Sequence, residues 1–213
     1  RGFSISQWKL LAGSSVGSLI AVFIALGAKI QWMREYLLNT DFSTFEDDSI
    51  GVIADIWRSL EKYGWHKGKK LRDWIYGALR HFGAEDWTFE QLYAKTGKTL
   101  FITATEVRKP MCKTWVYSRY STPTKKLLDA IHTSCSVPAF FEATFESGQV
   151  FTDGGVLENY PISVLGNHLP ETAIMGLYIK GPDENSGLSK PVENYLEFLQ
   201  AIINTLLHKA STS

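Results

Sequence analysis

The turn around Ser15 constrains the fold more than any other part of the sequence, which reads LLAGSSVGSLIAVFIALG from Leu10 to Gly27. A short apolar run precedes the turn, and a longer run that is apolar on nearly every face follows it. The second run has the character of a buried helix, whereas the first alone is too short to distinguish a strand from a piece of helix. A buried strand, a glycine-bounded turn and a buried helix are typical of a sheet with helices packed on it, so we expect an α/β fold.

The bulk composition describes an ordinary globular domain. Of 213 residues, 45% are hydrophobic and 21% are charged, and the formal net charge is zero. Balanced charge gives no argument for nucleic acid as a partner. The two cysteines, Cys112 and Cys135, do not make a disulfide framework or a metal site, so we expect unpaired thiols. The longest apolar run, Leu19–Leu26, is far shorter than the ~20 residues that span a bilayer.

The spacing of apolar residues changes along the rest of the chain. Residues 31–95 have mostly helical spacing, with helices predicted over 49–64, 68–83 and 88–97 and with Thr88 as the cap of the last one. After residue 97 we expect two strands, a helix, a hairpin with Ser147-Gly148 at its turn, a further strand and an amphipathic helix, over 98–107, 113–120, 124–135, 143–155, 172–181 and 190–209. No repeat or linker is found, so residues 1–213 are predicted to form one domain.

Ser15 is the candidate nucleophile. The sequence Gly13-Ser14-Ser15-Val16-Gly17 fits Gly-x-Ser-x-Gly, a strained strand-to-helix turn with the middle serine at its apex. Glycines two positions before and after the serine let the backbone fold tightly without a Cβ clash. The Val16 N–H, at the start of the following helix, would stabilise an oxyanion formed as Ser15 attacks an ester carbonyl. Two alternatives stay open: a small-residue turn that only packs, and Ser14 as a rival nucleophile.

A serine hydroxyl needs a base that takes its proton. Of the five histidines, only His168 and His208 fit the chain order of the α/β-hydrolases, and neither has neighbours that indicate catalysis. Asp153 is the stronger candidate, because it ends a predicted strand and is followed by Gly154 and Gly155, which permit close approach of the backbone. An Asp-Gly pair by itself is also typical of a simple turn.

Three segments in this order, AGSSVGSLIA, SCSVPAFF and FTDGGVLENYP, resemble the patatin-like phospholipases. The family pattern is a Gly-x-Ser-x-Gly elbow, a small-residue segment with proline and phenylalanine, and Asp-Gly-Gly followed by asparagine and proline. The resemblance implies a three-layer α/β/α fold with a central, mostly parallel sheet, to which residues 31–95 add a helical region. It also implies a dyad of Ser15 as nucleophile and Asp153 as general base, an acyl-enzyme intermediate, and no metal or other cofactor.

The start of the chain departs from the family pattern. The family has a glycine-rich oxyanion loop after its first strand and a helix between that loop and the serine strand. Here only FSISQW follows Arg1-Gly2 before the serine strand. Gly2, with Arg1 as the basic residue beside it, is the oxyanion candidate by this resemblance. The N-terminal strand and glycine-rich loop are therefore expected to be incomplete.

The resemblance implies a lipid acyl hydrolase of the phospholipase A or lysophospholipase type. The expected partners are phospholipids or other acyl-ester lipids, reached by transient peripheral contact with a membrane, and an activating protein is left open. The basic stretch His66–Arg72 is either a docking patch or a solvated helix start. The expected location is the cytoplasm, or secretion as an effector, since the chain begins with Arg1 rather than Met.

Two other function classes stay open. The first is a catalytically impaired patatin-like module that binds lipid or protein, which the missing oxyanion glycines favour. The second is a histidine-dependent serine esterase, which would need His168 or His208 in place of Asp153.

Overall fold

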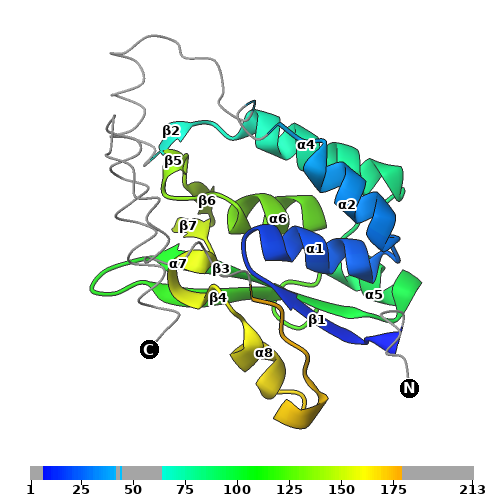
Figure 1. Ribbon diagram of the computed structural model, residues 1–213. Coiled ribbons are helices and arrows are strands. Elements are labelled where there is room, and N and C mark those ends of the chain that lie inside the picture. The colour runs from blue at the N-terminus through cyan, green and yellow to red at the C-terminus, as the bar shows by residue number, and fades with distance from the viewer. Residues whose placement is uncertain (1–6, 42–43, 45–63, 179–213) are drawn as a thin grey trace, which may run out of the picture.

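The computed structural model describes residues 7–41, 44 and 64–178, which form an α/β structure (Figure 1). Helices α1 (Val16–Ala25) and α6 (Leu127–Ser134) pack on one face of a central sheet. The short helix α8 (Ile162–Gly166) lies below the sheet and contacts its first strand. The predicted α/β class, with helices packed on a central sheet, is confirmed.

Five strands form the central sheet, in the order β1-β3-β7-β6 with β4 beside β3. They are β1 (Leu10–Gly13), β3 (Thr99–Val107), β4 (Lys113–Ser118), β6 (Thr144–Glu146) and β7 (Gln149–Asp153). β1 runs parallel to β3, and the pairs β3–β4, β3–β7 and β6–β7 are antiparallel. The prediction was a mostly parallel sheet; over the described strands the sheet is mixed. Short connections make the β3–β4 and β6–β7 pairs antiparallel, and β7 also pairs antiparallel with β3, which it follows by several elements.

Strands β1 and β7 share one edge of β3 and meet there end to end. The register pairs Gly13 with Ile102. It also pairs Asp153 with Ala104, while β4 occupies the opposite edge of β3 over the same residues. Because β1 is parallel to β3 and β7 is antiparallel, both strands point their C-terminal ends at Thr103. The fold thereby brings together the residues that follow Gly13 and those that follow Asp153.

The region 31–95 is mostly helical in its described part, which contains α2 (Ile30–Leu38), β2 (Gly64–His66), α4 (Lys69–His81) and α5 (Phe89–Thr96). Thr88 caps α5 as predicted: its hydroxyl accepts from the Gln91 N–H, and the Gln91 side chain accepts from the Thr88 N–H. The helix predicted over 49–64 lies almost wholly outside the described residues. That residues 1–213 form one domain remains a prediction.

Two features of the described chain differ from the sequence reading. β2 pairs in parallel with β5 (Ala139–Phe141) to form a small second sheet, which was not predicted because three-residue strands have too few positions to show a period. The strand predicted over 172–181 is wrong in its described part, which forms a single 3₁₀ turn and then an unpaired segment with Met175, Leu177 and Tyr178 exposed. A β-rich run becomes a strand only beside a partner, and none of the described strands pairs with it. The helix predicted over 190–209 lies outside the described residues.

The hairpin between β6 and β7 follows its prediction. Ser147 and Gly148 form the turn, and both have positive φ angles, 49° and 80°. Two consecutive positive φ angles match the right-handed twist of the flanking strands. The turn therefore fixes the register that places Asp153 at the end of β7.

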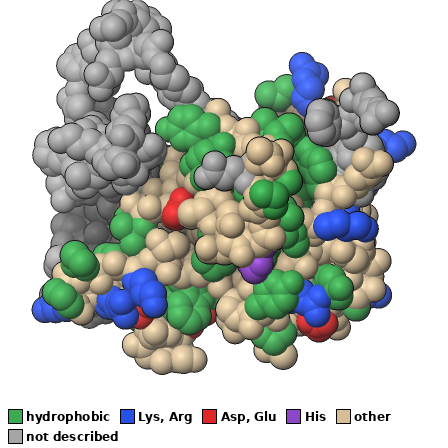
Figure 2. All heavy atoms as spheres, turned by 90° about the horizontal axis from the view of Figure 1, so that it is seen from below, with side chains coloured by type: hydrophobic (Ala, Val, Ile, Leu, Met, Phe, Trp, Pro, Cys, Tyr) green, Lys and Arg blue, Asp and Glu red, His purple; other side chains and the backbone are tan. Residues whose placement is uncertain are grey.

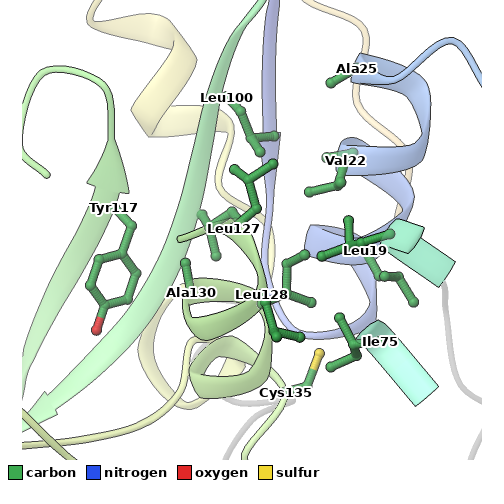
Figure 3. Packing of buried hydrophobic residues seen from close by; sticks show 14 of the residues in the cluster. Leu19, Val22, Ala25, Ile75, Leu100, Tyr117, Leu127, Leu128, Ala130 and Cys135 are labelled. Carbon is green, nitrogen blue, oxygen red and sulfur yellow. The ribbon is translucent and has the colours of Figure 1, made fainter. Parts of the chain in front are cut away.

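Helix α1 occupies the centre of the hydrophobic core (Figure 3). Its residues Leu19 and Val22 are completely buried. Side chains from three other elements surround them: Leu100 of β3, Ile75 of α4 and Leu127 of α6. Full burial of each such aliphatic side chain contributes about 1.5–3 kcal/mol to stability. The helix that begins beside Ser15 is thus anchored in the core by the buried residues between Ser18 and Ala25.

Lys98 contacts the opposite end of α1. Its side chain is buried, and Nζ donates to the Ile24 carbonyl oxygen at 2.9 Å. Burial lowers the pKa of this amine, and the charge of Lys9 lowers it further. A cation at a helix C-terminus is favoured by the helix dipole, so Lys98 adds a second donor to the Ile24 carbonyl, which also accepts from the Gly27 N–H at 3.2 Å.

Candidate active site

Ser15 occupies a strained turn between β1 and α1. Its backbone angles are φ 51° and ψ −132°, a conformation that a residue with a side chain rarely adopts. A Cβ at Gly13 would lie 2.3 Å from the Gly17 carbonyl oxygen, so only glycine fits at position 13. A Cβ at Gly17 would meet nothing within 4 Å, so the expectation that both glycines relieve a clash is wrong for Gly17.

Backbone hydrogen bonds close this turn. The Gly17 N–H donates to the Ser14 carbonyl at 2.8 Å. The Ser15 carbonyl accepts from both the N–H and the hydroxyl of Ser18, at 2.8 and 2.6 Å. Because the surrounding groups fix both sides of Ser15, its side chain is held at the apex.

The structure brings Ser15 and Asp153 into direct contact. The Ser15 hydroxyl donates to Oδ2 of Asp153 at 2.6 Å, and the Gly155 N–H donates to Oδ1 at 2.6 Å. Asp153 is only 4% exposed. Burial raises the pKa of this carboxyl to about 7, against the opposing effect of the two hydrogen bonds. The carboxylate thus has both oxygens engaged in a site that disfavours its charge.

The glycines after Asp153 allow this approach. A Cβ at Gly154 would lie 2.4 Å from the Thr103 carbonyl oxygen, and one at Gly155 would lie 3.0 Å from Oδ1 of Asp153. Gly154 therefore lets the end of β7 pass against β3, at the point where β1 also ends. The short helix α7 (Gly155–Glu158) begins immediately afterwards.

Val16 presents the N–H that the sequence assigned to an oxyanion. It is the first residue of α1, where the helix dipole places partial positive charge, and the first turn of α1 carries no acidic residue. The preceding N–H, that of Ser15, donates to Oγ of Ser134 at 3.0 Å and is therefore occupied. Arg1 and Gly2, the other oxyanion candidates, lie outside the described residues.

In the described part of the chain, the hydrogen bonds of Ser15 go to Asp153, Ser134 and Ser18 and not to a histidine. His168 is exposed and stacks on the ring of Phe101 and on that of Tyr120, with centroids 5.0 and 5.8 Å apart. His208 lies outside the described residues. The described geometry therefore favours the carboxylate over an imidazole as the group that faces the serine.

The sequence reading missed two residues at this site, Ser134 and Thr103. The hydroxyl of Ser134 donates to the Thr103 carbonyl at 2.7 Å as it accepts from the Ser15 N–H. Ser134 begins the quoted segment SCSVPAFF, but a small residue at a helix end carries no signal for this contact. Its neighbour Cys135 is buried, and both burial and the charge of Asp153 raise the pKa of the thiol, so it stays protonated.

The described part of this site holds no metal cluster, and a hollow found elsewhere in the described chain does not belong to it. The residues that the structure describes contain no group of three or more His, Cys, Asp or Glu side chains that could hold a metal ion. A hollow of about 540 Å³ lies between α2 and α4, where Trp32, Tyr36 and Trp74 line it. It shares no lining residue with the site around Ser15.

Comparison with known proteins gives one family model and several similar proteins. A family model described as Patatin-like phospholipase matches residues 4–165. Uncharacterized protein R571 of Acanthamoeba polyphaga mimivirus is 28% identical over 199 residues, covering 91% of this chain and 63% of the viral protein. Triacylglycerol lipase 4 of Saccharomyces cerevisiae is 26% identical over 183 residues, covering 74% of this chain and 19% of the yeast protein. The chain thus spans less than two thirds of either relative. The crystal structure of VipD from Legionella pneumophila aligns with 73% of this chain and 41% of its own, at a TM-score of 0.49 and 14% identity.

The two glycines of the elbow should respond differently to alanine. Gly13→Ala places a methyl group against backbone at 2.3 Å and should lower the free energy of unfolding by about 3 kcal/mol or more. Gly17→Ala adds a methyl group in open space within α1 and should raise it by about 0.5–1 kcal/mol. Urea unfolding measures both, and equal destabilisation would contradict the difference between the two positions.

Asp153→Asn should stabilise the fold at high pH. Because burial raises the pKa of Asp153 to about 7, the folded state keeps a proton that the unfolded state has already released above about pH 4. The free energy of unfolding of the wild type therefore falls as pH rises through that window. Asparagine does not ionise, so the variant does not lose stability in this way. At pH 8 its free energy of unfolding should exceed that of the wild type by on the order of 1 to 4 kcal/mol.

Urea unfolding of this variant at pH 8 and pH 4 tests the expectation. The gain should shrink at pH 4, where the wild-type carboxyl is protonated in the folded state. Asp73→Asn is the matched control, since Asp73 is exposed and pairs with Lys69 on the surface of α4. A gain that is independent of pH would show that the buried charge is not its cause.

Proposed function

The chain belongs to the patatin-like phospholipase family, and from that premise we propose that it hydrolyses acyl esters of lipids with Ser15 as the nucleophile and Asp153 as the general base. The observation that carries the proposal is the 2.6 Å hydrogen bond from the Ser15 hydroxyl to a buried carboxylate. A nucleophile within hydrogen-bond reach of its base is the arrangement that proton transfer requires.

The first half of the reaction transfers the acyl group to the enzyme. Asp153 takes the proton of Ser15, whose Oγ bonds to the ester carbonyl carbon, and the carbonyl oxygen becomes an oxyanion. The Val16 N–H at the start of α1 stabilises that negative charge. The ester C–O bond then breaks, and the leaving alcohol takes the proton from Asp153.

The second half returns the enzyme to its starting state. Asp153 takes a proton from a water molecule, whose oxygen attacks the acyl-enzyme carbonyl. The bond between the acyl carbon and Ser15 Oγ breaks, Ser15 regains the proton, and the fatty acid leaves. The pKa of about 7 supports this double use, because a base near the pH of the medium both accepts and returns a proton readily.

Apolar surface beside the dyad supports a lipid substrate. Val16, next to Ser15, and Leu157, on the helix that follows Asp153, are each 38% exposed. Outside this pair, Ile162 on α8 and Tyr120 against His168 are also exposed, and Figure 2 shows hydrophobic side chains spread among polar ones on the lower face. We propose a phospholipid substrate, cleaved in phospholipase A or lysophospholipase fashion, and take triacylglycerol as the comparison substrate because one yeast relative bears that name.

Contact with the membrane is proposed to be peripheral. None of the helices within the described residues has the length and apolar character to cross a bilayer. The basic stretch His66–Arg72 is a weaker docking candidate than the sequence indicated, since His66 is buried and Arg72 pairs with Asp129 at 2.6 Å. Exposed apolar side chains such as Val16 are therefore proposed to meet the lipid surface. A cytoplasmic location and an activating protein partner remain proposals.

Labelling with a fluorophosphonate, followed by turnover of phosphatidylcholine vesicles and a triolein emulsion, tests the function. The wild type should be labelled at Ser15 and should release fatty acid, with a preference for the vesicles. Ser15→Ala should abolish both, and Asp153→Asn should reduce kcat by on the order of 10³-fold, because the base is lost. Ser14→Ala should keep both activities.

His168→Ala separates the proposal from the histidine-dependent alternative. Because His168 stacks on Phe101 and the Ser15 hydroxyl donates to Asp153 instead, this variant should keep the wild-type rate. Loss of activity in this variant, with retention in Asp153→Asn, would establish the other mechanism. A folded wild type that neither reacts nor turns over lipid would favour the non-catalytic module.

The pH dependence of kcat/KM should report the carboxyl group. Asp153 accepts a proton only when ionised, and burial raises its pKa to about 7. Activity toward a short-chain ester should therefore rise through about pH 7 and fall away below it. An acid limb near pH 4, where an ordinary aspartate titrates, would contradict the proposed role of the buried site.

A further inference from the structure

Ser134 contacts every chain segment that carries the proposed dyad. Its side chain is completely buried at the C-terminal end of α6. Its hydroxyl accepts from the Ser15 N–H at 3.0 Å and donates to the Thr103 carbonyl at 2.7 Å. Its own carbonyl accepts from the Gly154 N–H at 3.3 Å. One residue thus joins the elbow after β1, the middle of β3 and the end of β7.

The Ser134 hydroxyl acts both as a hydrogen-bond donor and as an acceptor. It donates its hydrogen to the Thr103 carbonyl, which leaves a lone pair of the oxygen to accept from the Ser15 N–H. Ser15 has a positive φ, which only surrounding contacts maintain. The bond to its N–H is a contact that fixes the peptide plane immediately before the nucleophile. Rotation of that plane would move Oγ away from Asp153.

We propose that Ser134 is a positioning residue for the acyl-transfer reaction: it holds the Ser15 backbone in the conformation that keeps Oγ against Asp153, a role that rests on the proposed function. A second effect follows from the same bond. Because Ser134 occupies the Ser15 N–H, that N–H does not turn toward the substrate, and Val16 supplies the first N–H of the elbow that faces an oxyanion.

Ser136 provides a matched control two residues away. It is also completely buried, and its hydroxyl donates to the His132 carbonyl at 2.8 Å within the same helix end. Its backbone carbonyl accepts from the Asp153 N–H and from the Thr152 hydroxyl, and a side-chain substitution keeps these bonds. Ser136→Ala therefore removes a buried hydroxyl of the same kind without touching Ser15.

A pH profile distinguishes positioning from a general loss of stability. The Ser15 hydrogen bond lowers the pKa of Asp153 against the effect of burial. If Ser15 moves away, that lowering is lost, and the acid limb of kcat/KM shifts to higher pH. Among the described residues, Cys135 is a titratable group that responds to the charge of Asp153, and its thiol is neutral because burial raises its pKa. The limb therefore reports the carboxyl group.

The experiment compares the wild type, Ser134→Ala, Ser134→Cys and Ser136→Ala as full chains. The readouts are the second-order rate of fluorophosphonate labelling, kcat and KM for a short-chain ester at several pH values, and the thermal unfolding midpoint. Ser134→Ala should lower the labelling rate and kcat about 10- to 100-fold, because a small misplacement of the nucleophile costs this much. Its KM should change less than twofold, and its acid limb should move upward.

The controls separate the possible outcomes. Ser136→Ala should keep the wild-type kcat and acid limb even if its midpoint falls as far as that of Ser134→Ala. Ser134→Cys keeps a weak donor and acceptor and should react at an intermediate rate, which tests the proposal if the alanine variant does not fold. If a Ser134 variant has the same labelling rate, kcat and acid limb as the wild type or as Ser136→Ala, the positioning role is overturned while the proposed function stands. A wild type that fails to label or turn over ester overturns the proposed function and the positioning role with it.

Discussion

The meeting of two strand ends on one edge of β3 is the constraint on which the site depends. β1 pairs in parallel up to Ile102, and β7 pairs in antiparallel fashion from Ala104. Opposite directions are necessary here, because two strands running the same way along that edge would place the end of one beside the beginning of the other. Residues 138 positions apart are thereby joined by a hydrogen bond. The glycines at 13 and 154 then remove the Cβ atoms that would keep these backbones apart.

The buried carboxylate of Asp153 lowers the stability of the folded state, and the rest of the fold compensates for it. Asp153 is buried deeply enough to raise its pKa to about 7, and burial of an ionised carboxylate opposes folding. Core packing around α1 and α6 offsets that cost. The same feature that weakens the folded state gives the carboxylate the basicity that a serine hydroxyl requires.

Much of this arrangement was predictable from the sequence, since its local signals are strong. The glycine pattern around Ser15, the Asp-Gly-Gly after a β-rich run and the capping box at Thr88 each have a local physical cause that a single segment records. The reading failed where the cause lies elsewhere in the chain. The role of Ser134 depends on three segments at once, and the run from residue 172 has no paired neighbour among the described strands. Gly17 has free space around the position of a Cβ, whereas Gly13 has none, and the symmetric sequence pattern does not reveal this difference.

Helix α1 extends this dependence to a residue far from the chemistry. Its ten residues span about 15 Å, with the proposed oxyanion donor at one end and the ammonium group of Lys98 against Ile24 at the other. The proposed oxyanion donor and the Lys98 contact are therefore the two ends of one element, so the placement of the donor depends in part on a side chain that lies a helix length away from it.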